Sequence, residues 1–237
     1  MSIWGRIVVG ATGFALGGPL GGILGVIAGS AFDKRRRSSF NFTHITQDQK
    51  QQIFTLSIIT LSAKLAKSDG QVTSDEINAF KEKFRIPKKE IPKISKIFNE
   101  AKKNVYGYKQ IADQVGIIFA DNKIILEELL NNLFYIAASD GKVSLNEVEM
   151  LKSISQSFKF SDKGFQRIFH TNIKNKQVDP YKILGVSRED EDNIIRKKLI
   201  ELNKEHHPDN LIAKGMPKEF INHSNDELAL INLVYEK

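Results

Sequence analysis

The residues best suited to chemistry gather near the carboxyl end, in the stretch "HHPDNLIAKG" from His206 to Gly215. Histidine changes charge nearest to neutral pH, so His206 and His207 could act as general bases or metal ligands, with Asp209 as the orienting acid. However, adjacent histidines at a helix end point in different directions, and no motif places a Ser, Cys or Glu to complete a site. An enzyme is therefore disfavoured, and neither a cofactor nor a metal ion is expected.

The flanking segments indicate a loop presented between two helices. The helix expected before the loop carries apolar side chains about one turn apart, at Ile194, Ile195, Leu199 and Leu202. Asp190 or Asp192 is expected to cap the start of this helix. Pro208 cannot continue the helix and biases the residue before it away from helical geometry, so residues 207–209 are expected to form a rigid, exposed turn. A further helix over 226–235 is expected to return antiparallel.

The stretch "DPYKILGV" precedes this helix, and Asp179 and Pro180 suit a helix N-cap and first turn, with Gly185 closing the short helix. Together with the His-Pro-Asp tripeptide, it resembles the J-domain of the DnaJ (Hsp40) family in order and spacing over residues 179–237. The resemblance implies that the chain binds the ATPase domain of a DnaK-type Hsp70 and accelerates its ATP hydrolysis. The implied Hsp70-binding residues are the tripeptide and the basic residues of the second helix: His207, Pro208, Asp209, Arg196, Lys197, Lys198 and Lys204.

The second helix and the position after the tripeptide depart from the usual J-domain pattern, and no fourth helix with its basic motif is expected after Tyr235. The Arg-Lys pair common near the middle of the second helix is replaced by Ile200 and Glu201, and the lysine that usually follows the tripeptide is Asn210. The loop itself is intact, so these changes bear on the strength of partner binding.

The middle of the chain contains an internal repeat of helical hairpins. "LAKSDGQVTSDEINAFKEKF" from Leu65 matches "IAASDGKVSLNEVEMLKSIS" from Ile136, 71 residues later. In each copy a helix ends at a glycine that can adopt the left-handed conformation, Gly70 or Gly141. A capping box then starts the next helix, formed by Thr73 with Glu76 in the first copy and by Ser144 with Glu147 in the second.

The shared carboxylates of this repeat have two interpretations. They could form a divalent cation site, for which the candidates are Asp69, Glu76, Asp140 and Glu147. Turn and cap chemistry explains the same positions without a metal, and no D-x-D-x-D-G loop is present, so the capping interpretation is favoured. The repeat resembles the TerB-like, tellurite-resistance-associated domain over residues 49–171, and this resemblance implies an all-helical interaction or sensing module.

The amino-terminal segment predicts a transmembrane helix over residues 7–32. This run has no charged residue, and its 26 positions would form a helix about 39 Å long, enough to cross a hydrocarbon core of about 30 Å. Glycines recur every fourth residue along one face of that helix, where they would let two helices approach closely and form a homodimer. The expected dimer face consists of Gly13, Gly17, Gly21, Gly25 and Gly29. The alternatives are a flexible apolar leader or a single span without a partner.

Charge around the apolar run predicts its orientation. Only Arg6 precedes the run, whereas a basic cluster at 34–37 follows it, which argues against a cleavable signal peptide. The positive-inside rule places residues 1–6 outside as a short extracytoplasmic, periplasmic tail and the later domains in the cytoplasm. The basic cluster, part of the juxtamembrane tether at 33–48, can rest on anionic membrane lipids, so the net charge of +7 requires no nucleic-acid partner.

The predicted organisation is therefore all-α, with a single-pass span, a TerB-like bundle, a linker at 172–178 and a carboxyl-terminal J-domain. The absence of cysteine suits a reducing compartment. This order of segments resembles the family of membrane-anchored J-domain co-chaperones of the DjlA type, which implies a bacterial inner-membrane location, regulation of DnaK and a link to envelope-related signalling. The alternative is a membrane-tethered TerB-like scaffold or sensor without chaperone activity.

Overall fold

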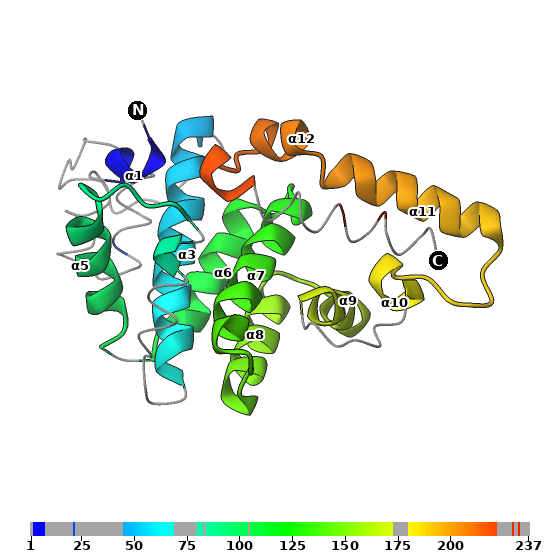
Figure 1. Ribbon diagram of the computed structural model, residues 1–237, viewed down its shortest axis with the longest axis horizontal. Coiled ribbons are helices and arrows are strands. Elements are labelled where there is room, and N and C mark those ends of the chain that lie inside the picture. Colours follow the sequence, from blue (N-terminus) through cyan, green and yellow to red (C-terminus); the bar gives the residue numbers. More distant parts are fainter. Residues whose placement is uncertain are drawn as a thin grey trace.

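The computed structural model describes residues 2–7, 21, 45–68, 80–82, 84–103, 105–172, 180–221, 229 and 232. Every regular element among these residues is helical, which confirms the all-α fold class (Figure 1). The elements are α1 (Ile3–Arg6), α3 (Gln47–Ser68), α5 (Ile91–Ala101), α6 (Tyr108–Ile118), α7 (Lys123–Ala137), η2 (Ala138–Asp140), α8 (Leu145–Ser157), α9 (Asp162–Asn172), α10 (Pro180–Leu184), α11 (Asp192–Glu205), α12 (Pro208–Ala213) and η3 (Lys218–Phe220).

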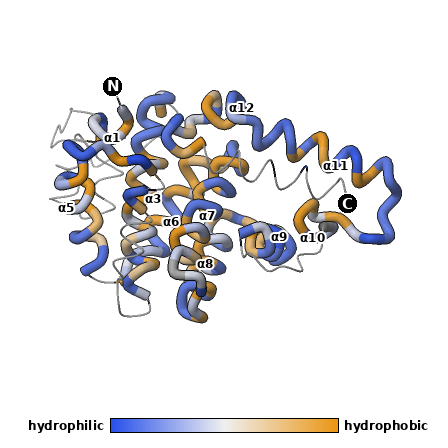
Figure 2. The backbone as a smooth tube through the Cα atoms, viewed as in Figure 1, coloured by the Kyte–Doolittle hydropathy of each residue, from blue (hydrophilic) through white to orange (hydrophobic). Residues whose placement is uncertain are grey.

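The helices α3 and α7 form the centre of a bundle. Helix α3 packs against α5, α6, α7 and α8, and α7 also contacts α8 and α9. Both helices are buried around most of their circumference, because other helices enclose them. In α7, for example, Leu129, Leu130, Leu133 and Phe134 are fully buried. Figure 2 shows a largely apolar bundle interior and a mostly hydrophilic α11 at the periphery.

The second copy of the internal repeat has the predicted turn and cap. Gly141 adopts the left-handed conformation, with φ of 88°, directly after η2. Ser144 accepts a hydrogen bond from the backbone N–H of Glu147, whose carboxylate accepts one from the backbone N–H of Ser144. The capping box is thus confirmed in this copy. In the first copy, Gly70, Thr73 and Glu76 lie outside the described residues.

The carboxyl-terminal segment shares its core with the bundle. Leu211, Met216 and Phe220 are buried in the same hydrophobic cluster as the side chains of α3 and α7. The ring of Phe220 lies 5.2 Å from that of Phe54 and 4.7 Å from that of Phe84. A separate small cluster joins α10 to α11 and consists of Ile183, Leu184 and Leu202, with Val186, Ile195 and Leu199 packed against it. Of the predicted apolar face of α11, Ile195, Leu199 and Leu202 pack on α10, whereas Ile194 is exposed.

The first residues of the chain differ from the expected extracytoplasmic tail. Trp4 is buried, with its ring 5.7 Å from that of Phe220, and the backbone N–H of Ile3 donates to the Glu219 carboxylate at 2.9 Å. Arg6 forms an ion pair with Asp48 at the start of α3. These contacts place residues 2–6 beside α3 and η3, whereas the sequence predicted an extracytoplasmic tail over residues 1–6.

No helix among the described residues is long and apolar enough to span a membrane. The predicted span at 7–32 falls almost wholly outside those residues. Of its expected dimer face, Gly21 alone is described, and Gly13, Gly17, Gly25 and Gly29 are not.

Candidate functional site

The helix before the tripeptide begins without the expected cap. Its N-cap residue is Glu191, which makes no side-chain capping bond, and Asp192 is already the first helical residue. Asp190 instead accepts a hydrogen bond from the backbone N–H of Ser187 at 2.7 Å and closes the preceding turn. The expectation that Asp190 or Asp192 caps α11 is therefore wrong, because one carboxylate serves the turn and the other lies one position too late.

The tripeptide forms the beginning of helix α12. His207 is extended, with φ of −60° and ψ of 131°, and serves as N-cap of α12. Its Nδ1 accepts a hydrogen bond from the backbone N–H of Asp209 at 3.3 Å. Pro208 occupies the first helical position, where its missing N–H costs nothing. The expected departure of His207 from helical geometry is confirmed, and of the expected turn at 207–209, Pro208 and Asp209 already belong to the first turn of α12.

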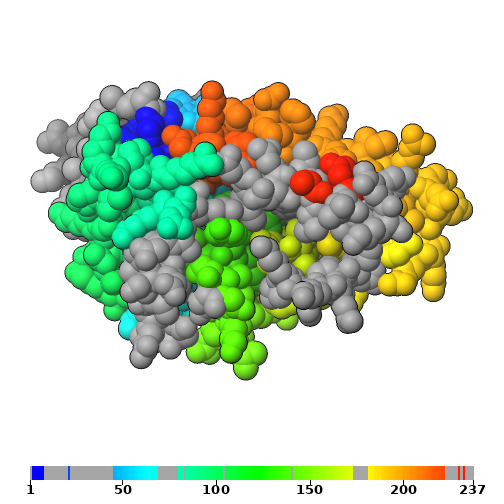
Figure 3. All heavy atoms as spheres, in the orientation of Figure 1, coloured from blue at the N-terminus to red at the C-terminus, as the bar shows by residue number. Residues whose placement is uncertain are grey.

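The side chains of the tripeptide face solvent. The side chain of His207 is 56% exposed and that of Asp209 is 90% exposed. Figure 3 shows α11 and α12 along one edge of the molecule, where a partner can approach them. The imidazole and the carboxylate can therefore meet a partner without unfolding the bundle.

Asn210 joins the two helices at the corner. Its side-chain amide donates to the backbone carbonyl of Glu205 at 2.8 Å and to that of Lys204 at 3.2 Å. Carbonyls in the last turn of a helix have no partner within the helix, so Asn210 satisfies two of them and fixes the angle of the corner. The sequence analysis treated Asn210 only as a departure from a usual lysine and missed this role.

The basic residues of α11 differ in their surroundings. Arg196, Lys197 and Lys204 are exposed, whereas Lys198 forms an ion pair with Glu201 at 2.8 Å. Ile200 is 59% exposed on the same helix. The structure thus leaves three of the four expected cations on the surface and offsets the charge of the fourth.

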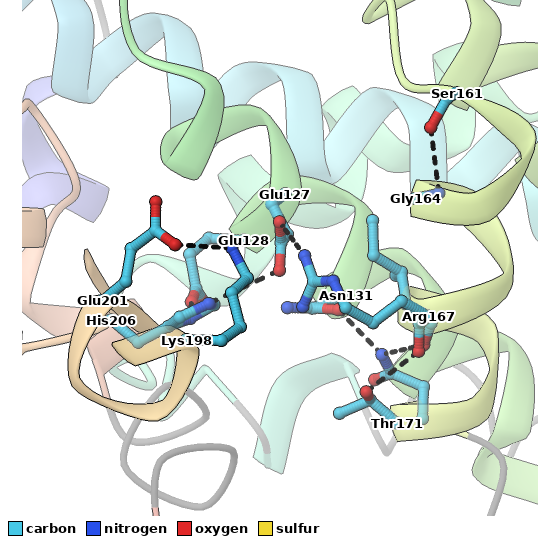
Figure 4. Close-up of polar contacts among 12 residues, drawn as sticks. Glu127, Glu128, Asn131, Ser161, Gly164, Arg167, Thr171, Lys198, Glu201 and His206 are labelled. Carbon is cyan, nitrogen blue, oxygen red and sulfur yellow. Dashed lines mark hydrogen bonds and ion pairs between the residues drawn. The ribbon is translucent and has the colours of Figure 1, made fainter. Parts of the chain in front are cut away.

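His206, the residue before the tripeptide, is buried and faces the bundle (Figure 4). Its Nδ1 lies 2.9 Å from an oxygen of Glu128, and its Nε2 lies 3.4 Å from an oxygen of Glu127. Both glutamates belong to α7, and Glu127 also pairs with Arg167 of α9. The two adjacent histidines therefore lie in opposite environments. Their rings do not face a common site in which they could act together as bases or metal ligands.

The electrostatics of this cluster favour a charged Glu127. Burial alone would raise the pKa of Glu127, but the Arg167 guanidinium and the His206 imidazole outweigh it and hold that pKa well below its usual range. Glu127 therefore remains ionised at neutral pH inside the protein. Buried charges of this kind are tolerated when they are paired and hydrogen-bonded.

The candidate cation ligands are only partly described. Glu147 is buried and serves the capping box, whereas Asp69 and Glu76 lie outside the described residues, as does the side chain of Asp140. Within the described part of the chain, no group of three or more His, Asp or Glu side chains is placed to hold a metal ion.

Comparisons with known proteins match two segments to family models. Residues 55–170 match the model of the tellurite resistance protein TerB, and residues 1–39 match the co-chaperone DjlA transmembrane domain. The second match supports the predicted membrane association of the chain. No solved structure matches the chain.

Several co-chaperone proteins match the chain over almost its whole length. It is 24% identical to the co-chaperone protein DjlA of Photobacterium profundum over 268 residues, covering 99% of this chain and 97% of that protein. It is 26% identical to the co-chaperone protein DjlA of Vibrio cholerae over 275 residues, covering 100% of this chain and 97% of that protein. The protein of the same name from Legionella pneumophila is 24% identical over 277 residues, covering 98% and 93% of the two chains.

Fold and family matches together define an all-helical protein with a TerB-like middle domain and a membrane segment at its amino end. More particularly, the chain is similar to the co-chaperone proteins DjlA over almost its whole length, as the sequence analysis predicted.

Proposed function

We propose that the chain stimulates ATP hydrolysis by a DnaK-type Hsp70 through His207, Pro208 and Asp209. The observation that carries this proposal is the exposed His-Pro-Asp tripeptide at the corner between α11 and α12. The relatives named co-chaperone, which match the chain over almost its whole length, support the same function. On this proposal the chain hydrolyses nothing itself and acts only on its partner.

Each residue of the tripeptide has a physical role in this proposal. Pro208 fixes the start of α12, and Asn210 fixes the end of α11, so the corner changes little on binding. His207 offers ring nitrogens to a partner, and the Asp209 carboxylate offers charge-assisted hydrogen bonds to a basic group. The test is the rate of ATP hydrolysis by the Hsp70 with and without the full-length chain, including the variants below.

The exposed cations of α11 are proposed to steer the acidic face of the partner toward the loop. Replacing Arg196 and Lys197 together by alanine should slow association at low salt, because long-range attraction acts mainly on the association rate. The difference from the wild-type chain should shrink as salt screens the charges. Stopped-flow binding at several salt concentrations measures this effect. The control removes Lys109 and Lys163, exposed on α6 and α9, and should leave the rate unchanged; a salt-independent loss would contradict the steering role.

For the membrane-inserted chain, we propose an amino terminus on the periplasmic side and the helical domains in the cytoplasm. The basic cluster at 34–37 supports this orientation, and in the membrane-inserted chain the contact of Trp4 with Phe220 would be released. A membrane-impermeant thiol reagent should label Ser2→Cys in intact spheroplasts, because the chain has no cysteine of its own. Glu189→Cys, exposed before α11, should react only after permeabilisation. Protection of Ser2→Cys until permeabilisation would show that the contacts of α1 persist in the membrane.

We propose that the chain forms homodimers through the glycine face of its membrane segment, Gly13, Gly17, Gly21, Gly25 and Gly29. Replacing Gly17 and Gly21 by leucine should weaken the dimer, since bulky side chains prevent close approach of the helices. A membrane two-hybrid assay measures the loss. Leucine at Gly18 and Gly22, which lie off this face, is the matched control. Equal association of the two double variants would exclude the proposed face.

A further inference from the structure

The side chain of His206, at the end of α11, points into the bundle. It is 0% exposed, although the next residue, His207, is largely exposed. A histidine is seldom fully buried unless its ring nitrogens have polar partners. Here both nitrogens face carboxylate oxygens of α7, those of Glu128 and Glu127.

The receiving side of this contact is rigid. Glu128 is 0% exposed on a helix that is buried along most of its length. Arg167 of α9 pairs with Glu127, and Asn172 of the same helix donates to Asn131 of α7 at 2.7 Å. These contacts brace α7 and α9 against each other, so the carboxylates that hold His206 have fixed positions (Figure 4).

The other end of the loop is held as well. Leu211, four residues after His207, is fully buried in the bundle core, and its backbone N–H donates to the carbonyl of His207 at 3.1 Å. Gln47 of α3 donates to the carbonyl of Ile212 at 2.5 Å. Residues 207–210 are therefore fastened to the bundle immediately before and immediately after the exposed tripeptide.

We propose that His206 is a positioning residue, which fastens α11 to α7 through Glu127 and Glu128 and so fixes the direction in which the TerB-like domain presents the His-Pro-Asp loop. This proposal rests on the proposed Hsp70 function and extends it, because it assigns the TerB-like domain a part in presenting the loop. His206 touches no partner and acts only through the orientation of its neighbours.

A fixed loop reduces the cost of binding, because fewer orientations are lost when the partner docks. The chemistry of stimulation depends on His207, Pro208 and Asp209, which remain exposed when His206 is released. Loss of the fastening should therefore raise the chain concentration that gives half-maximal stimulation and leave the maximal stimulation nearly unchanged. A purely structural role in folding the J-domain would instead lower the maximum.

The test uses the full-length chain in lipid nanodiscs with spin labels at Leu145→Cys and Glu189→Cys, both exposed, one on the bundle and one before α11. His206→Leu removes both ring nitrogens at similar volume. His206→Asn retains a donor near the position of Nδ1 and should restore the bond to Glu128. Glu128→Gln disturbs the same contact from α7, and His170→Leu on α9 is the control for loss of a histidine outside the cluster.

The expected result is a narrow label-to-label distance distribution in the wild-type chain and in His170→Leu, and a broad one in His206→Leu. Glu128→Gln should broaden the distance distribution similarly, and the distribution of His206→Asn should be narrower than that of His206→Leu. The half-stimulating concentration should rise severalfold wherever the distribution broadens. Thermal melting shows which variants are folded. If His206→Leu does not fold, the proposal is tested with Glu128→Gln.

Two results would overturn the proposal: unchanged distances in the folded variants, or broadened distances without a change in the half-stimulating concentration. If the wild-type chain itself fails to stimulate Hsp70, the proposed function fails and the positioning role falls with it. The distance measurement would still show whether His206 fastens the two parts of the chain, so the two failures are distinguishable.

Discussion

His207→Gln is expected to abolish stimulation of a DnaK-type Hsp70 while the protein remains folded. The imidazole is 56% exposed and makes one long bond, 3.3 Å, to the backbone N–H of Asp209, so its loss disturbs little of the structure. Glutamine is polar and of similar length but cannot place two ring nitrogens in the geometry of imidazole. Steady-state ATP hydrolysis measures the effect, and circular dichroism with thermal melting checks the fold.

The matched control for this prediction is His170→Gln, which changes a half-buried histidine of α9 in the same way. It should stimulate Hsp70 as well as the wild-type chain does. Full stimulation by His207→Gln would refute the role of the tripeptide. It would then favour the alternative of a membrane-tethered TerB-like scaffold without chaperone activity.

Glu127→Gln is expected to destabilise the fold by about 3–5 kcal/mol at neutral pH. Removing one partner of a buried charge pair leaves the other uncompensated, here the Arg167 guanidinium, and such losses are of this order. Urea unfolding of the full-length chain measures the difference in free energy of unfolding. Glu149→Gln, an exposed change on α8, is the control and should lie within about 0.5 kcal/mol of the wild-type protein.

The same substitution has a predicted pH dependence. Burial opposes ionisation, but Arg167 and His206 lower the pKa of Glu127 in the folded protein below its value in the unfolded chain. Its contribution to stability is therefore fully present above the ordinary value, about 4.5, and is lost as pH falls below it toward the folded pKa. The stability gap between wild type and Glu127→Gln should shrink below pH 4.5. A gap that widens on acidification would contradict this account of Glu127.

Local patterns predicted the features that depend on adjacent residues. The Asp-Gly turn and the Ser144 capping box follow from backbone chemistry within a few positions, and the structure has both. Helix α10 starts at Pro180 and ends before Gly185, whose φ is 73°, as the sequence predicted. Spacing of apolar residues likewise predicted three of the residues by which α11 packs on α10, whereas the fourth, Ile194, is exposed.

Contacts between residues far apart in the sequence were not predicted from local patterns. The burial of His206 depends on Glu127 and Glu128, nearly 80 residues earlier, and nothing in "EHHPDN" indicates it. A signal was present in α7, where two adjacent glutamates interrupt the apolar run "KIILEELL". Charged residues inside an otherwise buried helix need partners, so this helix indicated an internal polar contact without identifying His206.

The packing of the carboxyl-terminal segment against the bundle could also not be predicted from the sequence. The sequence analysis placed a linker at 172–178, and in the structure Leu211, Met216 and Phe220 complete the hydrophobic core of the bundle. The segment that carries these residues is too short for a helical pattern of apolar residues, so its sequence does not indicate which helices it packs against. The candidate binding loop is consequently held by the domain that precedes it.

The central claim is that the chain accelerates ATP hydrolysis by an Hsp70 partner, and the most direct measurement is a titration. The full-length chain in nanodiscs is added to a DnaK-type Hsp70 loaded with ATP, and the single-turnover hydrolysis rate is recorded at each concentration. We expect the rate to rise with the concentration of the chain and then to saturate, as for a specific complex. A rate that stays flat across the titration would contradict the co-chaperone function proposed for this protein.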